Sequence, residues 1–243
     1  MSSWADMTAP TVTAAAADGA VALWPVGATE QHGSHLATGF DLAAAQAVCD
    51  GVDRRLGAGV VLLPGLALGA SDHWLPLGGT LSLRAETMAA VAADVLRSIE
   101  EAGFEHVVVV NGHHGNIGPL LTALGASRER VRVEAISYWL LVDQDELARR
   151  CVADDGGIGH AGEVETSIGL HLGGLVTGEP GPGAPLGEGP GSSAHRFLRS
   201  PRAQEIPGGV LGDPRSASAG FGAWLIDSAS DALADHCTRL RRV

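Results

Sequence analysis

The most informative segment for the architecture reads His106-Val107-Val108-Val109-Val110-Asn111-Gly112-His113. Its four consecutive valines are too few and too β-branched for a helix, so they predict a strand. Because the run does not alternate between apolar and polar residues, both faces of this strand must be covered. The segment therefore predicts a central strand, with helices packed on both sides of its sheet.

Strand and helix signals alternate on both sides of this segment. Short apolar runs predict further strands at 21–27, 60–63 and 131–141, although Pro25 is more typical of an edge strand or a strand end. The spacing of apolar residues predicts helices at 40–56, 83–101, 117–124, 143–150, 163–172 and 216–242. This order is typical of an α/β fold, and we expect a single-domain three-layer α/β/α sandwich with a mostly parallel sheet.

One domain is expected over residues 20–243, preceded by a polar, alanine-rich arm at 1–19. Residues 173–214 form an excursion from the alternating pattern, and Gly and Pro dominate its part between 178 and 191. We interpret this excursion as a surface flap or a subunit contact, with a disordered segment as the alternative.

The composition excludes several kinds of protein. The 243 residues carry a formal net charge of −12, which disfavours nucleic acid and anionic membranes as partners. All 16 Lys and Arg residues are arginines, so mechanisms that need a lysine, such as pyridoxal-phosphate anchoring, are excluded. No apolar run approaches a membrane span, which takes roughly 20 residues. The three scattered cysteines and the lack of a secretory signal favour reduced thiols in the cytoplasm.

Three loops at predicted strand ends or helix starts carry imidazole and carboxylate groups, at 27–35, 111–116 and 160–167. Glu30 and His32 are two residues apart, so their side chains project the same way in an extended stretch, and Asp41 follows at a helix start. These groups can converge on one divalent ion, such as zinc, manganese or iron(II), and the lack of cysteine in the loops disfavours a structural zinc. Alternatively, Glu30 and Asp41 are surface acids or helix caps.

The segment Asn111-Gly112-His113 places an imidazole at the mouth of a buried strand, which suits a rigid metal ligand. A turn explains its asparagine and glycine but not its histidine. For His114 the choice is open between a ligand, a substrate contact and a solvent-facing neighbour. His73 and Trp74 follow the second predicted strand, and we interpret them as a substrate contact and a lid, or as a loop with one packed tryptophan.

Several pieces of sequence, spread from residue 29 to residue 214, are similar to motifs of one known family. They are Thr29-Glu30-Gln31-His32-Gly33, Asp41, Gly79-Thr80-Leu81-Ser82-Leu83, Asn111-Gly112-His113-His114-Gly115-Asn116, His160-Ala161-Gly162-Glu163-Val164-Glu165-Thr166-Ser167 and Gly209-Val210-Leu211-Gly212-Asp213-Pro214. Through them the chain resembles the creatininase family of metal-dependent amidohydrolases. The resemblance implies a single α/β/α domain that assembles as a hexamer.

The resemblance also implies a site for two divalent metal ions, zinc or manganese, with iron in some members. Carried over by motif, Glu30 and His113 would hold one ion, His32 the other, and Asp41 would bridge them. Glu165 would complete the shell of the second ion. Two such ions, about 3.5–4 Å apart, bind a water between them and lower its pKa, so that it attacks an amide carbonyl.

His160 matches a family histidine that is not a ligand, and it would give a proton to the departing nitrogen. Glu163 is either a partner of His160 or an acid in the first turn of a helix, where it favours the helix dipole. The sequence departs from creatininase itself at Gly115, where that enzyme has a carboxylate. This departure bears on the ligands of the second ion and on creatinine as the substrate.

The expected function is hydrolysis of the C–N bond in a small amide, a cyclic amide or an amidine-like compound. Two alternatives within the family are cleavage of a short or precursor peptide, as in the member that trims the mycofactocin precursor, and deformylation, as in the formamidopyrimidine deformylases. A different class is a non-catalytic scaffold subunit that keeps the fold. The motif residues are shared among the enzymes and do not separate them.

Overall fold

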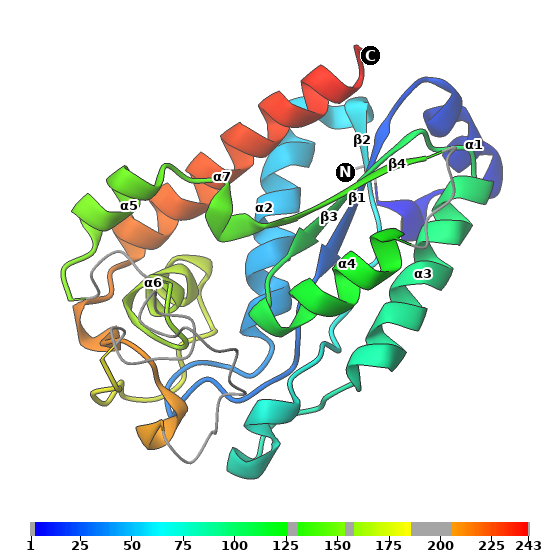
Figure 1. The fold of residues 1–243 in the computed structure, drawn as a ribbon. Coiled ribbons are helices and arrows are strands. Elements are labelled where there is room, and N and C mark those ends of the chain that lie inside the picture. The colour runs from blue at the N-terminus through cyan, green and yellow to red at the C-terminus, as the bar shows by residue number, and fades with distance from the viewer. Residues whose placement is uncertain (1–2, 126–130, 154–157, 186–205, 243) are drawn as a thin grey trace.

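A parallel four-stranded sheet forms the centre of the molecule (Figure 1). The computed structural model describes residues 3–125, 131–153, 158–185 and 206–242. The strands are β1 (Val21–Val26), β2 (Val60–Leu62), β3 (His106–Asn111) and β4 (Arg132–Ser137). They lie in the order β2-β1-β3-β4, and every pairing is parallel. β3 therefore has a neighbour on each side, as the valine run predicts.

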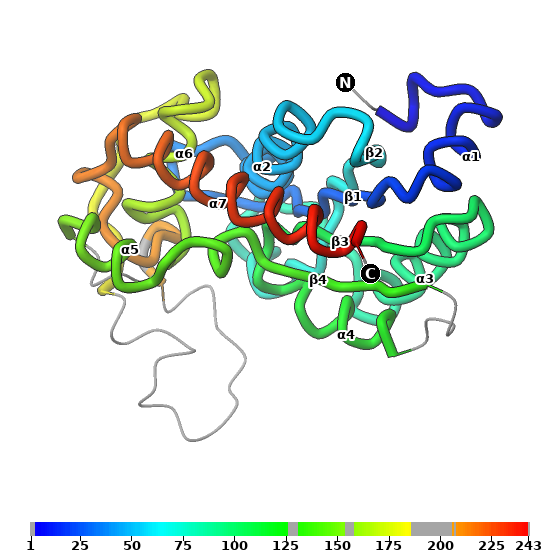
Figure 2. Tube along the Cα trace, turned by 90° about the horizontal axis from the view of Figure 1, so that it is seen from above, coloured from blue at the N-terminus to red at the C-terminus, as the bar shows by residue number. Residues whose placement is uncertain are grey.

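Helices cover both faces of this sheet (Figures 1 and 2). One hydrophobic core contains side chains of α2 (Phe40–Leu56), α5 (Gln144–Arg150), α6 (Glu163–Leu172) and α7 (Ala219–Leu240). The other core contains side chains of α1 (Ala9–Ala17), α3 (Ala85–Glu101) and α4 (Ile117–Gly125). The predicted three-layer α/β/α sandwich is confirmed.

The side chains of β3 alternate between these two cores. Val108 and Val110 pack in the core of α2 and α7, whereas Val107 and Val109 pack in the core of α3 and α4. None of the four is more than 1% exposed. Each buried valine contributes about 1.5–3 kcal/mol through the hydrophobic effect. Because two of them lie in each core, β3 stabilises the packing of helices on both faces of the sheet.

Pro25 lies in β1, between two neighbouring strands, and not at an edge of the sheet. The N–H and the C=O of a strand residue point to the same side of the strand. The carbonyl of Pro25 accepts a hydrogen bond from Leu66 N at 3.0 Å, and Leu66 lies beyond the end of β2. The missing N–H would therefore also have pointed to this side. The pairing of β1 with β2 ends at Leu23 and Leu62. The missing N–H of Pro25 therefore costs no ladder hydrogen bond.

The segment expected as a polar arm contains a helix that the sequence analysis did not predict. α1 packs on the core of α3 through Val12 and Ala16, and Trp4 stacks on Phe104 at 5.4 Å between ring centroids. Alanine-rich helices show little contrast between their faces, so hydrophobic periodicity does not reveal them. β4 is shorter than expected, because residues 138–140 form the 3-10 turn η5 (Tyr138–Leu140).

The described ends of the excursion lie against the rest of the domain. Ala37 N donates to Leu175 O at 2.8 Å, and Leu211 exchanges two backbone hydrogen bonds with His160, at 2.9 and 2.8 Å. Residues 186–205, the middle of the excursion, lie outside the described residues. The end of the excursion therefore borders the loop that carries His160.

Cys49 and Cys237 are buried and Cys151 is partly buried, and these three described cysteines form no disulfide with one another. Among the residues that the structure describes, no helix combines the length and the apolar character that crossing a bilayer takes.

Candidate metal centre

The carboxyl ends of β1 and β3 meet the first turn of α2 at close range. A Cβ atom at Gly27 would lie 2.2 Å from Leu42 N, and one at Gly112 would lie 2.1 Å from Asp41 O. Side chains do not fit at such distances, so only glycine allows this approach of backbone to backbone. The two glycines thereby bring Asp41 close to His113, which directly follows Gly112.

Buried side chains from two loops and from the first turns of α2 and α6 face one another at this edge of the sheet. Five of them, at most 5% exposed, are Glu30, His32, Asp41, His113 and Glu165. His113 Nδ1 lies 3.3 Å from Glu30 Oε1 and 3.2 Å from Asp41 Oδ2. His32 Nε2 lies 3.1 Å from Asp41 Oδ1 and 3.7 Å from Glu165 Oε2. The structure thus brings together all five residues that the sequence analysis named as ligands.

Three of the buried atoms in this cluster have no hydrogen-bond partner: Glu30 Oε2, His32 Nε2 and Asp41 Oδ2. Buried polar atoms without partners are unfavourable, and buried charges are normally paired or coordinate metals. Two of them, His32 Nε2 and Asp41 Oδ2, lie at ion-pair distance from a neighbour without forming a hydrogen bond. This is the arrangement of ligand atoms that point at a shared cation.

Within the described residues, three groups of donor atoms lie close enough together to hold a metal ion. They are Glu30 with Asp41 and His113, His32 with Asp41 and Glu165, and Glu30 with His32 and His160. Asp41 belongs to the first two groups, so it is placed to serve two neighbouring ions. Carboxylate and imidazole donors without thiolates suit zinc, manganese or iron(II). The residues present therefore fit a binuclear centre.

Backbone carbonyls orient both imidazoles of the first two groups. His32 Nδ1 donates to Glu30 O at 3.1 Å, and His113 Nε2 donates to Ala70 O at 3.1 Å. Each bond leaves the other ring nitrogen to face the carboxylates. Metal-bound histidines are commonly held in this way, by a carbonyl or carboxylate on the nitrogen that does not bind the ion.

Without a cation, the carboxylates attract protons to these imidazoles. Burial by itself lowers the pKa of His32, but Asp41, Glu165 and Glu30 outweigh it and raise this pKa to about 9. Burial also opposes the charge of His113, yet Glu30 and Asp41 raise its pKa well above the usual value. A divalent cation would take the place of these protons, so metal binding would release them.

The start of α6 supplies Glu165, and the loop before it supplies His160. Burial is the main reason that the pKa of Glu165 is raised to about 7. His160 Nε2 donates to Gln31 O at 2.8 Å, and its Nδ1 lies 3.5 Å from Glu30 Oε1. Burial and the neighbouring His32 lower the pKa of His160 to about 3, so this ring is neutral at pH 7.

Two asparagines hold the loop after β3 in place. Asn111 donates to His113 O at 2.7 Å and accepts from His113 N at 3.1 Å. Asn116 accepts from Ala70 N at 3.0 Å and donates to Gly27 O at 2.9 Å. The sequence analysis interpreted Asn111 only as a turn residue. It gave no role to Asn116, whose bonds span 46 and 89 positions and have no sequence signal.

His73 and Trp74 lie beside the cluster in the 3-10 helix η3 (Asp72–Leu77). The His73 ring is nearly parallel to that of His113, with 6.0 Å between centroids, and Trp74 stacks on His160 at 4.3 Å. Trp74 is only 4% exposed, so it forms a packed wall of the site. His114 begins the next turn, η4 (His114–Asn116), and is exposed.

Glu163 anchors a neighbouring turn. Its carboxylate accepts hydrogen bonds from Val152 N, at 2.8 and 2.9 Å, and from Ala153 N at 2.8 Å. Among the described residues, the carboxylate within ion-pair distance of His160 is that of Glu30, at 3.5 Å. These contacts favour Glu163 as an acid at the helix start over Glu163 as the partner of His160.

Gly115 lies where any side chain would disturb the cluster. A Cβ atom there would lie 2.2 Å from Ala70 O and 2.5 Å from His113 Nε2. It would therefore break the hydrogen bond that orients His113. A carboxylate at this position needs a different path for the loop that contains Ala70.

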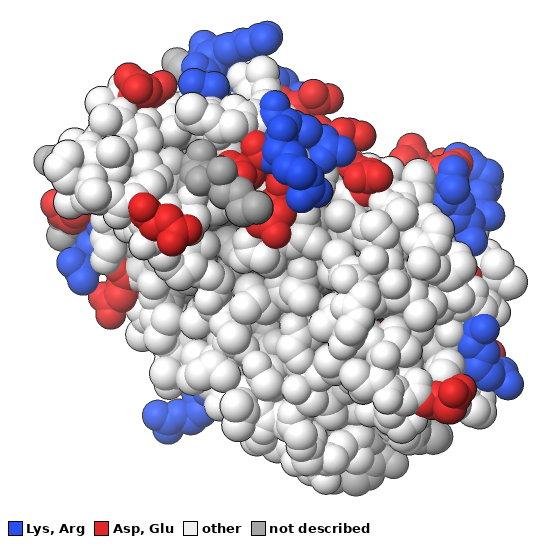
Figure 3. All heavy atoms as spheres, turned by 180° about the vertical axis from the view of Figure 1, so that it is seen from behind, with Lys and Arg blue, Asp and Glu red and all other residues white. Residues whose placement is uncertain are grey.

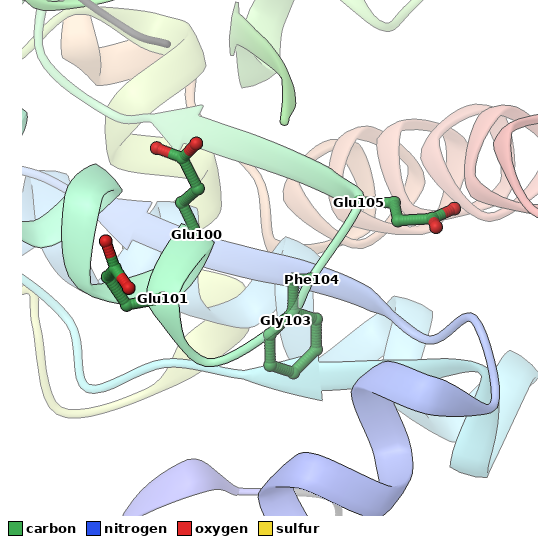
Figure 4. A pocket seen from close by; sticks show the side chains of 5 residues that line it. All are labelled: Glu100, Glu101, Gly103, Phe104 and Glu105. Atoms are coloured by element: carbon green, nitrogen blue, oxygen red, sulfur yellow. The ribbon is translucent and has the colours of Figure 1, made fainter. Parts of the chain in front are cut away.

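A separate hollow lies at the opposite edge of the sheet, where α3 leads into β3 (Figure 4). Its lining residues are Glu100, Glu101, Gly103, Phe104 and Glu105. The side chain of Glu105 points away from those of Glu100 and Glu101 in Figure 4. None of the donor groups found among the described residues includes these glutamates, so we place the candidate chemistry at the carboxyl ends of the strands.

Comparison with known proteins agrees with this geometry. Residues 5–237 match the family Creatininase, described as creatinine amidohydrolase. The chain belongs to the creatininase family. The family resemblance that the sequence motifs predict is thereby confirmed.

Two kinds of creatininase-family relative are similar to this chain. The creatinine amidohydrolase of Pseudomonas putida is 31% identical over 174 residues, which span 65% of this chain and 66% of that enzyme. The mycofactocin precursor peptide peptidase of Mycobacterium tuberculosis is 34% identical over 227 residues, which span 88% of this chain and 82% of the peptidase. A crystal structure of creatininase superimposes with a TM-score of 0.82 at 25% identity and covers 98% of this chain and 97% of its own.

Proposed function

We propose that this chain is a metal-dependent amidohydrolase that cleaves the C–N bond of a small amide, cyclic amide or amidine-like compound. The observation that carries the proposal is the place of Asp41 in two donor groups, whose buried atoms include three without a hydrogen-bond partner. A similar solved structure, 25% identical with a TM-score of 0.81, is a zinc–zinc form of a creatininase mutant. It supports a two-ion site in this family.

In this proposal, Glu30 and His113 hold one ion, His32 and Glu165 hold the other, and Asp41 serves both. The donor set suits zinc or manganese, and it also accepts iron(II). When bound, such ions lower the pKa of the attacking water and polarise the amide carbonyl. The chain supplies the orientation, because backbone carbonyls hold both imidazoles.

His160 moves the proton in this proposal. In the metal-free protein, burial and the neighbouring His32 lower the pKa of His160 to about 3, so the ring is neutral at pH 7 and does not begin as an acid. It accepts a proton from the attacking water at Nδ1, the nitrogen that faces Glu30, and passes it to the departing nitrogen. The bond from Nε2 to Gln31 O fixes the ring during this transfer.

Metal analysis tests the centre. Protein purified without chelator should contain about two equivalents of divalent metal by mass spectrometry. Glu30→Ala should lose both metal and turnover, whereas Leu121→Ala, a change at a residue that is 63% exposed, should keep both. Less than about half an equivalent in the unaltered protein would favour the scaffold alternative, and an active Glu30→Ala enzyme would contradict the ligand set.

A short or precursor peptide is the second candidate substrate. Peptidase relatives match 88% of this chain at 34% identity, whereas the creatinine amidohydrolase matches 65% at 31%. We assign the substrate contacts to His73, Trp74 and His114, which border the cluster. An activity screen of the metal-loaded protein against lactams, creatinine, formamides and short peptides, read by product mass, separates amidase, peptidase and deformylase.

We also propose that the chain forms a homo-oligomer, with a hexamer as the state that the family resemblance implies. Figure 3 shows a broad area without charged side chains on the face opposite to that of Figure 1. Separately, three leucines in the segment after Trp74 are exposed: Leu75, Leu77 and Leu81. Copies with a net charge of −12 repel one another unless they meet through uncharged surface. Light scattering after size exclusion tests this, and a mass of 24.8 kDa would contradict it.

A cytoplasmic location is part of the proposal. Its support is the set of three cysteines, which form no disulfide with one another in the structure, because cytoplasmic proteins keep their thiols reduced. Cell fractionation followed by detection of the chain tests this location.

A further inference from the structure

Ala161 has an unusual backbone conformation beside the cluster. Ala161 is fully buried and has φ of +52°, the left-handed region that residues other than glycine rarely adopt. Its N–H donates to Glu165 Oε2 at 2.5 Å, and its carbonyl accepts from Thr166 Oγ1 at 3.3 Å. Residues held in such strained conformations persist when their surroundings hold them, and they concentrate at functional sites.

A buried histidine completes this arrangement. His35 Nε2 lies 2.9 Å from Thr166 Oγ1. Because the Thr166 hydroxyl donates its proton to Ala161 O, it accepts from His35, so His35 carries its proton on Nε2. His35 Nδ1 is buried and has no hydrogen-bond partner. The chain of donors therefore runs one way, from His35 through Thr166 to Ala161.

We propose that His35 and Thr166 are positioning residues for Glu165 and His160. They hold the backbone of Ala161 at its carbonyl, so that the N–H of this residue meets Glu165 and keeps this carboxylate 3.7 Å from His32. Because Ala161 directly follows His160, the same contacts fix the backbone that carries His160. We call this series of contacts, from His35 through Thr166 and Ala161 to Glu165, the relay. The inference rests on the proposed metal centre, because the relay ends at the donor group that contains His32 and Glu165.

The relay positions the donor group of His32, Asp41 and Glu165, and its two side chains are too buried to contact substrate. His35 is 0% exposed and Thr166 is 2% exposed. Partners that hold metal ligands from behind commonly change metal affinity about 10–100-fold when they are removed. Loss of the relay should therefore weaken the ion held by His32 and Glu165, while the ion held by Glu30 and His113 stays bound.

The experiment is a zinc titration of chelator-treated protein, followed by calorimetry, with four variants. Thr166→Val removes the hydroxyl at nearly constant volume and should weaken one of two zinc-binding steps about 10–100-fold. Thr166→Ser keeps the hydroxyl and should restore wild-type affinity. His35→Gln keeps a donor and should lie nearer to wild type than His35→Leu.

Ser167→Ala is the matched control. Ser167 is a buried hydroxyl in the same helix, and it donates to Glu163 O at 2.7 Å and accepts from Ser218 N at 3.0 Å. Its loss should lower the melting temperature in the way that the loss of Thr166 does, yet leave both zinc steps unchanged. The comparison separates a positioning role from a purely structural one.

The inference is overturned if Thr166→Val binds two zinc ions as tightly as the unaltered protein, or if Ser167→Ala weakens zinc equally. It is also overturned if Thr166→Ser fails to restore affinity. Failure of the proposed function has a different signature, since the unaltered protein itself would then bind no zinc.

Discussion

The metal-free protein should lose stability when the pH rises from 7.5 to 9.5. The reason is the buried contact between His32 and Asp41, at 3.1 Å, which raises the pKa of His32 from the ordinary 6.5 to about 9. A histidine whose pKa is higher in the folded state stabilises the fold fully below the unfolded pKa. That contribution disappears as the pH rises through the folded pKa.

The size of the effect follows from the two pKa values of His32. The difference between 6.5 and about 9 corresponds to a contribution of about 3 kcal/mol at low pH. About 2 kcal/mol of this should disappear between pH 7.5 and 9.5. This window lies above the pKa of Glu165, about 7, so the ionisation of that carboxyl adds little to the change.

Urea unfolding at pH 7.5 and 9.5, in the presence of a chelator, measures the effect. His32→Gln is the control variant. Between the two pH values, its free energy of unfolding should fall by about 2 kcal/mol less than that of the wild type. Zinc-loaded protein should also show little dependence, because the ion replaces the proton. An equal loss of stability in the chelated wild type and in His32→Gln would refute the reasoning.

Three further changes have defined outcomes. Gly112→Ala places a Cβ 2.1 Å from Asp41 O, so it should cost about 1–3 kcal/mol of stability and weaken metal binding; an unchanged melting temperature would contradict the close approach. Tyr138→Phe removes a buried hydroxyl that lacks a partner, so urea unfolding of the metal-free protein should show no loss, and a gain of up to about 1–3 kcal/mol; a clear loss would show that the hydroxyl has a partner. His160→Ala should keep the metal and lose about 10²–10⁴-fold in rate; loss of metal would make His160 a ligand.

The layered architecture could be predicted from local pattern. The four valines from 107 to 110 needed cover on both faces, and the structure gives each face its own core. Prediction failed where the pattern is weak or the rule incomplete. α1 is rich in alanine, so its faces barely differ, and Pro25 is tolerated inside β1 because β2 ends before it.

The sequence predicted which donor residues form the candidate site, but not the hydrogen bonds that hold them in place. Glu30, His32, Asp41 and His113 could be grouped because the ends of parallel strands meet at one edge of the sheet. Gln31 illustrates the other case. It lies between two named residues, but only the structure shows that its carbonyl holds His160. Such a bond joins residues 129 positions apart, and no local signal marks it.

By itself, the sequence determined the alternation of strands and helices and the kinds of ligand atom at the loop ends, because these depend on residue type and short-range spacing. Only the tertiary structure decided that Asp41 belongs to two donor groups, that Glu163 holds a backbone turn, and that Ala161 is held by His35 through Thr166. These relations are distances between atoms far apart in the chain. They are set by how the layers pack, which spacing along the sequence does not encode.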